Sequence, residues 1–188
     1  RLRLDPPAAL PPGPYTLALT LLDAEGELLS DPLPVCQLAL EPACVPTGEP
    51  ADLPNRVEAD FGGIIRLWGY GAAQTSEALT LTLTWGALAE TPADYTFFVH
   101  LFDPSSEYIA AQIDTMPHAF THPTSTWIPG EIVTDTVRLS LAGVPPGAYR
   151  VAVGWCDASG RLPAWDAAGA PLDQDRVILS TWVNIPGR

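Results

Sequence analysis

The chain has 188 residues with 9 arginines, no lysine, 22 acidic residues and a formal net charge of −13. Binding to phosphates requires clustered basic side chains, so this charge and the single, scattered arginines argue against nucleic-acid partners and anionic lipid surfaces. Its 15 glycines and 21 prolines stay below the roughly 25–30 % that marks low-complexity chains, and 47 % of the residues are apolar. We therefore expect a packed core.

A repeat organises the chain from its first residues. Residues 10–15 read Leu-Pro-Pro-Gly-Pro-Tyr and lead through alternating apolar residues to Asp23-Ala24-Glu25-Gly26. Residues 144–149 read Val-Pro-Pro-Gly-Ala-Tyr and lead to Asp157-Ala158-Ser159-Gly160, and a fainter copy runs from Tyr95 to Asp103. Each copy predicts a strand followed by a tight turn. The Pro-Gly-x-Tyr units also resemble the tyrosine corner of β-sandwiches, which gives Tyr15 and Tyr149 structural roles.

The first copy lacks the long segment that precedes the second copy. We therefore expect residues 1–45 to be the C-terminal part of a preceding β-sandwich repeat, within a piece cut from a longer polypeptide. Residues 46–56 are rich in proline and read as a linker, and residues 57–188 form one complete module. The alternative is that residues 1–45 donate strands to the same sandwich. In an oxidising compartment Cys36 and Cys44 would close a short disulfide loop; otherwise they and Cys156 are small buried thiols.

The second module shows strand patterns only. Leu79, Leu81, Leu83 and Trp85 alternate with threonines, and the run 95–102 is apolar on both faces, as in a central strand. Further alternating runs cover residues 137–141 and 177–183, and prolines punctuate the chain at the intervals of a sandwich. The class is all-β. We expect a Greek-key β-sandwich, immunoglobulin-like or jelly-roll-like, rather than a closed barrel.

Aromatic side chains provide the first candidate contacts. Four tryptophans lie in predicted strands, where burial is expected: Trp68, Trp85, Trp155 and Trp182. Trp127 and Trp165 lie instead in predicted loops, where an exposed indole face stacks on a sugar ring; the alternative is a lid over one end of the core. Asp114 and His122 complete the predicted ligand contacts.

Metal ligands are the second class of candidate. Carboxylate oxygens from loops suit calcium, and four of them lie in or near the loop before the last strand, although no Asp-x-Asp-x-Asp-Gly loop is present: Asp157, Asp166, Asp173 and Asp175. A solvated acidic surface explains them equally, and we expect no cofactor. A zinc site from His118, His122 and Asp114 is a further alternative, but the first two flank a segment between prolines where a helix is disfavoured.

A hydrolase is the remaining chemical alternative. Ser125 has no Gly-x-Ser-x-Gly elbow around it, and His100 alternates with core residues, which is typical of a buried and hydrogen-bonded histidine. The residues therefore favour a chain without catalytic groups of its own.

Two strings carry a resemblance: residues 94–103, DYTFFVHLFD, and residues 123–131, PTSTWIPGE. Together with the Pro-Pro-Gly-x-Tyr unit, residues 160–163 and residues 61–70, they make the chain similar to uncharacterised bacterial β-sandwich modules. Such modules lie at the C-terminal end of multi-pass membrane proteins of glycosyltransferase type. The resemblance covers about residues 57–188 and implies a position outside the cytoplasmic membrane, in a membrane-anchored parent whose catalytic residues lie elsewhere.

These observations lead to two expectations. The first is a non-catalytic extracytoplasmic accessory module that binds a glycan or another cell-envelope component through the loops at one end of the sandwich. The alternative is a structural spacer that holds another domain away from the membrane.

Overall fold

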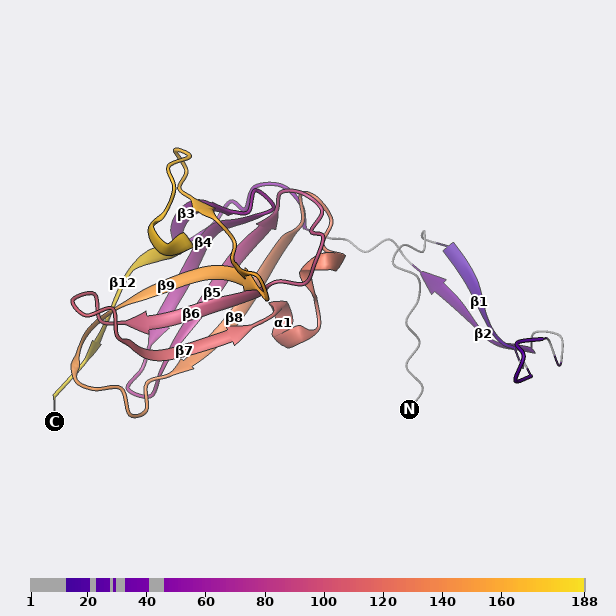
Figure 1. Ribbon diagram of the computed structural model, residues 1–188, viewed down its shortest axis with the longest axis horizontal. Helices are drawn as coiled ribbons and strands as arrows, with labels where there is room; N and C mark the ends of the chain where they lie inside the picture. The colour runs from indigo at the N-terminus through magenta and orange to yellow at the C-terminus, as the bar shows by residue number, and fades with distance from the viewer. Residues whose placement is uncertain (1–12, 21–22, 28, 30–32, 41–45, 188) are drawn as a thin grey trace. The chain divides into compact units, whose positions relative to one another are not determined.

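The computed structural model describes residues 13–20, 23–27, 29, 33–40 and 46–187 (Figure 1). The chain divides into two compact units, residues 1–44 and residues 45–188. The predicted disulfide between Cys36 and Cys44 and the predicted hydroxyl contact of Tyr15 lie outside what the structure describes.

The first unit contains one antiparallel strand pair, β1 (Gly13–Leu19) and β2 (Leu33–Leu40). Asp23 begins the turn beyond β1. Its Oδ1 atom accepts hydrogen bonds from the backbone N–H groups of Glu25 at 3.0 Å and Glu27 at 2.8 Å. Gly26 has a φ of +88°, a conformation that favours glycine.

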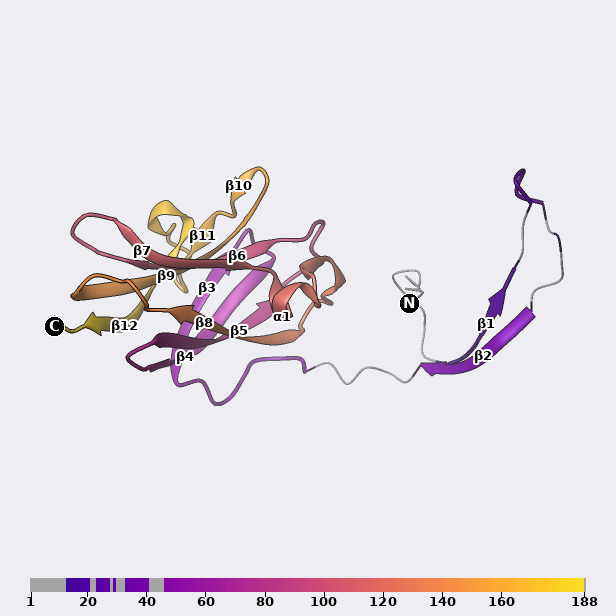
Figure 2. The same cartoon turned by 90° about the horizontal axis from the view of Figure 1, so that it is seen from below.

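The second unit is all-β, with two antiparallel sheets that lie one above the other and do not close into a barrel (Figures 1 and 2). Sheet 1 has the strand order β11-β3-β4-β5-β8, and sheet 2 has the order β10-β9-β6-β7 with β12 also paired to β9. The bounds are β3 (Asn55–Phe61), β4 (Ile65–Gln74), β5 (Ala78–Ala87), β6 (Thr96–Phe102), β7 (Ile109–Thr115), β8 (Ile132–Ser140), β9 (Gly147–Asp157), β10 (Gly160–Arg161), β11 (Ala164–Trp165) and β12 (Val177–Ile185).

Alternating apolar side chains fill the space between the sheets. Leu79, Leu81, Leu83 and Trp85 of β5 are fully buried, as their alternation predicts. Trp85 is at the centre of an aromatic cluster, with ring centroids 4.9 Å from Trp155 and 5.6 Å from Phe97. The predicted central strand is β6, which pairs with β7 on one side and β9 on the other. Contacts of this kind supply most of the hydrophobic stabilisation of a sandwich.

Two local features of the repeat are explained by hydrogen bonds. The Tyr149 hydroxyl donates to the Pro145 carbonyl at 2.9 Å, which is the predicted tyrosine corner. The turn aspartates Asp103 and Asp157 each accept the backbone N–H of the serine two residues later, at 2.8 Å and 2.7 Å. Asp23 makes the same contact with Glu25, so all three copies of the repeat use an aspartate carboxylate to close the turn.

The segment that the sequence predicts as a linker contacts the second unit. The Pro46 carbonyl accepts the N–H of Ile132 at 2.7 Å, and the Gly48 N–H donates to Gly130 at 3.1 Å. Strand β3 then begins at Asn55, inside the predicted linker range 46–56.

The loop between β7 and β8 contains short helical turns, which the sequence did not predict. In α1 (Pro117–Phe120) the residues His118, Ala119 and Phe120 have φ values of +49°, +51° and +71°, so the backbone between Pro117 and Pro123 turns in the left-handed sense. One-turn 3₁₀ helices follow at η1 (Thr124–Thr126) and, before β12, at η2 (Asp173–Asp175). Within the described ranges, no helix is long and apolar enough to cross a membrane.

Candidate functional site

Trp127, a predicted sugar platform, lies in the core. Its side chain is 3 % exposed, its ring packs edge-on against Trp155 with centroids 5.9 Å apart, and its Nε1–H donates to the His122 carbonyl at 3.2 Å. The indole therefore has no free face on which a sugar ring could stack. A loop position between prolines does not decide burial, and here the loop folds its tryptophan back over the end of the aromatic cluster.

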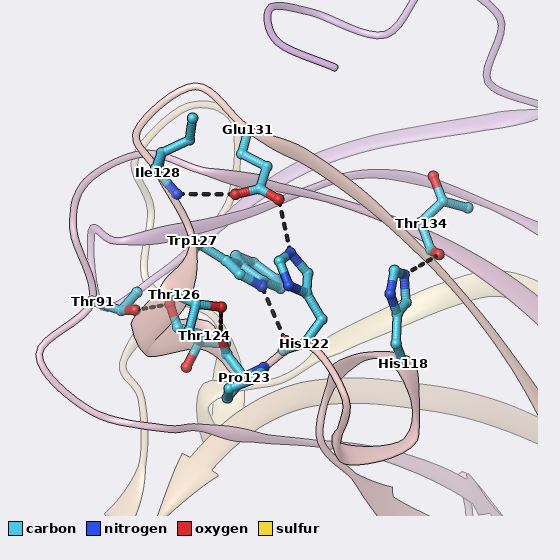
Figure 3. Close-up of polar contacts among 10 residues, drawn as sticks. All are labelled: Thr91, His118, His122, Pro123, Thr124, Thr126, Trp127, Ile128, Glu131 and Thr134. Atoms are coloured by element: carbon cyan, nitrogen blue, oxygen red, sulfur yellow. Dashed lines mark hydrogen bonds and ion pairs between the residues drawn. The ribbon is translucent and has the colours of Figure 1, made fainter. Parts of the chain in front are cut away.

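His122 is held by a buried carboxylate (Figure 3). Its Nε2 atom donates to Oε1 of Glu131 at 2.8 Å, while Oε2 of the same glutamate accepts the Ile128 N–H at 2.9 Å. Glu131 is only 6 % exposed, and burial of a carboxylate is tolerated because both oxygens have partners. The His122–Glu131 pair thus fixes the loop that carries Trp127.

His118 lies beside this pair on the same loop. Its ring stacks on that of His122 with centroids 5.5 Å apart, and its backbone N–H donates to Oδ1 of Asp135 at 2.7 Å (Figure 3 shows both rings). Burial raises the pKa of Asp135 above its ordinary value, although the His118 N–H opposes this. Across the residues described, no three His, Cys, Asp or Glu side chains are grouped as they would be to hold a metal ion.

The remaining predicted contact residues and metal ligands lie apart. Asp114 is exposed on β7 of sheet 2, where it accepts a hydrogen bond from Gln112 at 3.1 Å. Three of the four calcium candidates accept backbone N–H groups. Asp157 accepts from Ser159 and Asp166 from Ala168 and Ala170 within their own turns, and Asp175 accepts from Ala164 of β11. The fourth, Asp173, begins η2. For Asp157, the hydrogen bonds from Ser159 lower the pKa of the carboxyl.

His100 is buried, as predicted, but its hydrogen bonding differs from the prediction. It is 7 % exposed and stacks on Phe98 at 4.6 Å between ring centroids, and its Nδ1 atom has no hydrogen-bond partner among the described residues. Burial lowers the pKa of its imidazole; the charges of Arg161 and Arg176 act in the same direction, and Asp114 opposes them.

Trp165, the other predicted platform, begins a continuous row of side chains across sheet 1. It lies in β11 opposite Asp60 of β3, Asp60 lies opposite Arg66 of β4, and Arg66 lies opposite Gly86 of β5. Gly86 in turn lies opposite Ile132 of β8. Residues that pair directly across strands point to the same face of a sheet. We call this line of five residues, with the neighbouring Trp68, the tryptophan row.

The tryptophan row faces away from the core. The residues that alternate with it in each strand, Phe61, Ile65, Leu67 and Ala87, are at most 2 % exposed and point inward. Trp165, Asp60, Arg66 and Ile132 are each partly exposed. The row therefore presents two partly exposed indoles, an acid and a base on one outer surface of the sandwich.

Trp68 reaches this surface by the ordinary alternation of β4, because it follows the inward-facing Leu67 and lies two residues after Arg66. The pairing of β4 with β5 passes from Leu67–Trp85 to Gly69–Thr84, and the pairing of β3 with β4 shifts between Arg56 and Ala59. Trp68 is thus the extra residue of a β-bulge, and Glu58 in the opposing segment has a φ of +58°. Such bulges re-aim side chains and are frequent next to functional sites. After this extra residue the even-numbered positions of β4 face inward, so that Tyr70 lies in the core.

Gly86 provides the room that Trp68 occupies. A Cβ atom at position 86 would lie 2.3 Å from Nε1 of Trp68, closer than two such atoms can approach. The guanidinium of Arg66 lies over the same indole, with its carbon 5.0 Å from the ring centroid. The indole therefore contacts Gly86 through its nitrogen edge and the Arg66 guanidinium through one ring face.

A groove of about 340 Å³ opens beside Trp68, at one end of the tryptophan row. Its volume falls within the range of roughly 300–1,000 Å³ of small-molecule sites. The lining residues are Gly48, Glu49, Trp68, Gly86, Ala87, Leu88, Gly130, Glu131 and Ile132. A larger cavity of about 630 Å³ lies between the 74–76 turn, the 141–146 loop and residues 185–187; among the described residues that line it, none is aromatic or charged.

Ion pairs flank Trp68 on both sides. Arg66 donates through Nε and Nη2 to the two carboxylate oxygens of Asp60 at 2.5 Å and 2.8 Å, a bidentate geometry. Arg56 binds Glu58 and Glu49, and Glu49 also lines the groove. The hydrogen bond with Asp60 raises the pKa of Arg66.

Trp68 is partly exposed, whereas the sequence predicts that it is buried. It lies in a predicted strand, and burial is the usual fate of such a tryptophan. A signal was present in the sequence: with Ile65 and Leu67 facing inward, a period of two places Trp68 on the outer face, and an extra residue is needed only for Tyr70 to face inward as well. No protein-family model matches the chain, and no curated protein sequence is detectably similar to it.

Proposed function

We propose that this chain is a non-catalytic accessory module that binds a glycan, or a glycan-bearing component of the cell envelope, on the outer face of sheet 1. The observation that carries this proposal is the tryptophan row: two partly exposed indoles, Trp165 and Trp68, on one face with the Asp60–Arg66 pair between them.

The chemistry of this face suits a carbohydrate. A pyranose ring offers an apolar C–H face that packs on an indole, and hydroxyls at its rim that require planar hydrogen-bonding groups. Arg66 uses two of its five N–H donors on Asp60 in the bidentate pair, and each carboxylate oxygen retains a lone pair. Both side chains are held in place before a ligand arrives, which reduces the entropic cost of binding.

The fold supports a proposal for the strand arrangement, and the resemblance described above supports one for the location of the protein. We propose a Greek-key, immunoglobulin-like arrangement for the second unit. Strands β5 and β8 are neighbours in sheet 1, and the strands that follow each of them in sheet 2, β6 and β9, are also neighbours, which supports it. The proposed location is extracytoplasmic, as part of a larger membrane-anchored protein of glycosyltransferase type.

A structural spacer is the second candidate function, and the repeat favours it. The same aspartate-closed turn occurs in both units, at Asp23 in the first and at Asp103 and Asp157 in the second. Tandem copies of one module are a common way to extend a protein. A spacer needs no ligand, so the two candidates make opposite predictions for a binding experiment.

A glycan array, followed by calorimetric titration of the best-bound glycan, tests the proposed function. We expect Trp68→Ala to weaken binding by about tenfold or more, as for an aromatic anchor at the centre of an interface. Trp182→Ala is the matched control, because Trp182 is 49 % exposed but lies on β12 of sheet 2. Absence of binding to every glycan, or equal binding by both variants, contradicts the proposal and favours the spacer.

A further inference from the structure

We infer that the ligand of the tryptophan row is a linear glycan chain laid across the strands of sheet 1, and that the row does not select a single terminal sugar. This inference rests on the proposed function and specifies the class of carbohydrate that the same face accepts. Three observations support it: the span of the row, the order of apolar and polar groups along it, and the groove at one end.

The row is wider than one sugar ring. Trp165 lies in β11 and Trp68 in β4, with β3 between them. Neighbouring strands are about 4.8 Å apart, so the backbones that carry the two indoles are separated by about 10 Å. A pyranose ring stacked on one indole leaves the other without a partner. A chain of rings that runs perpendicular to the strands contacts both.

The groups along the row alternate in character. An indole at Trp165 is followed by the Asp60–Arg66 pair and then by the indole of Trp68. The side chains of Asp60 and Arg66 are 27 % and 29 % exposed, so they reach solvent and are fixed by their own ion pair. One sugar ring then stacks on each indole, and the ring between these two places its hydroxyls against the carboxylate of Asp60 and the guanidinium of Arg66. This order fits a repeating chain of sugars.

The groove extends the row beyond Trp68. Gly86 belongs to both the row and the groove, and Ile132, the last residue of the row, lines the far wall. Leu88, which is 37 % exposed, adds apolar surface there. A chain that follows the row from Trp165 therefore reaches a cavity large enough to accept a further ring.

The test is a titration of the intact chain with oligosaccharides of increasing length. The probes are cello-, xylo-, manno- and chito-oligosaccharides of one to six rings, measured by calorimetry. For the series that binds, we expect affinity to rise by about tenfold or more between one ring and about three rings and then to level off, because the strands that carry the two indoles are two strand spacings apart.

Two variants locate the two ends of the chain. Trp165→Ala removes the gain from longer oligomers but leaves binding of the shortest ones unchanged, whereas Trp165→Phe keeps the length dependence because an aromatic face remains. Trp68→Ala weakens binding at every length. Thermal unfolding of each variant verifies that it is folded.

The outcomes separate the inference from the proposed function. Equal affinity for one ring and for six rings, with loss of binding in Trp68→Ala, overturns the linear-chain inference and leaves the glycan-binding function in place. Retention of the full length dependence in Trp165→Ala also overturns the inference. Absence of binding to all four series at every length overturns the linear-chain inference, and absence of binding to every glycan on the array overturns the proposed function.

Discussion

The indole of Trp68 lies over Gly86, so close that its Nε1 atom occupies the space of a Cβ atom at that position. This contact joins β4 to β5 at the point where their pairing is interrupted by the bulge. The position of the indole on the surface thus depends on the absence of a side chain on the neighbouring strand.

Replacement of Gly86 by alanine is expected to displace the Trp68 ring without unfolding the chain. The new methyl group would lie 2.3 Å from Nε1, so the indole must shift to admit it. We expect a loss of stability of about 1–3 kcal/mol from overpacking and a loss of glycan binding equal to that of Trp68→Ala. Denaturant unfolding and calorimetric titration measure the two effects.

Gly71→Ala is the matched control for this prediction. Gly71 lies in β4, the strand that carries Trp68, and its Cβ would be 3.8 Å from Thr82, an ordinary contact. Full binding by Gly86→Ala would show that the position of Trp68 does not matter for the ligand.

Trp127→Ala is expected to destabilise the second unit strongly. The indole is buried against Trp155, and its removal leaves a cavity at the end of the aromatic cluster. Loss of a buried tryptophan costs about 3–5 kcal/mol. Trp182→Ala removes the same side chain from the surface together with its contact to Arg150, and we expect a cost below about 1 kcal/mol. Similar unfolding midpoints for the two variants would contradict the buried position of Trp127.

Asp135 is expected to make stability depend on pH. Burial raises the pKa of its carboxyl, so the folded state binds this proton more tightly than the unfolded chain does. Its contribution to stability is therefore complete below the ordinary Asp value of about 3.9 and is lost as the pH rises through the raised value.

An isosteric variant isolates this effect. Asp135→Asn keeps an oxygen that accepts the His118 N–H. It replaces Oδ2, which has no hydrogen-bond partner among the described residues, with an uncharged NH₂ group. We expect its advantage in unfolding free energy over the natural sequence to be largest near pH 7 and to shrink toward about pH 4. An advantage that grows on acidification would contradict the prediction.

His100 is expected to have the opposite dependence. Burial lowers the pKa of the imidazole, so the unfolded chain takes up the proton first as the pH falls. Stability is thus lost below the ordinary His value of about 6.5, down to the lowered value. In His100→Gln this part of the pH dependence should disappear, which urea unfolding at about pH 7.5 and 5 measures. If the free energy of unfolding of His100→Gln changes between the two pH values as much as that of the natural sequence, other groups cause the dependence.

The sequence was a good guide wherever one short pattern determined the local structure. The alternation of Leu79 to Trp85 predicts the buried face of β5, and Pro-Gly-x-Tyr predicts the hydroxyl contact of Tyr149. Both features depend on residues a few positions apart. The same holds for the aspartates that close the turns.

The candidate site was predicted only in part because it depends on pairing between distant strands. Trp165 was predicted as a platform, but its neighbours Asp60 and Arg66 come together with it only through the register of β11, β3 and β4. Trp68 and Trp127 exchanged their expected places. The alternation of β4 places the strand tryptophan on the outer face, and the His122–Glu131 pair folds the loop tryptophan inward.

The interlocked order of the strands has a consequence for the rate of folding. Strand β5 pairs with β8 only after β6 and β7 have been passed, and β6 pairs with β9 in the other sheet. Contacts between residues so far apart in the chain close large loops before they gain any stabilisation, which places such domains in the millisecond-to-second range. During synthesis, one edge of β5 remains unpaired until residues 132–140 have emerged, so the nascent chain can mispair at this edge until β8 is complete.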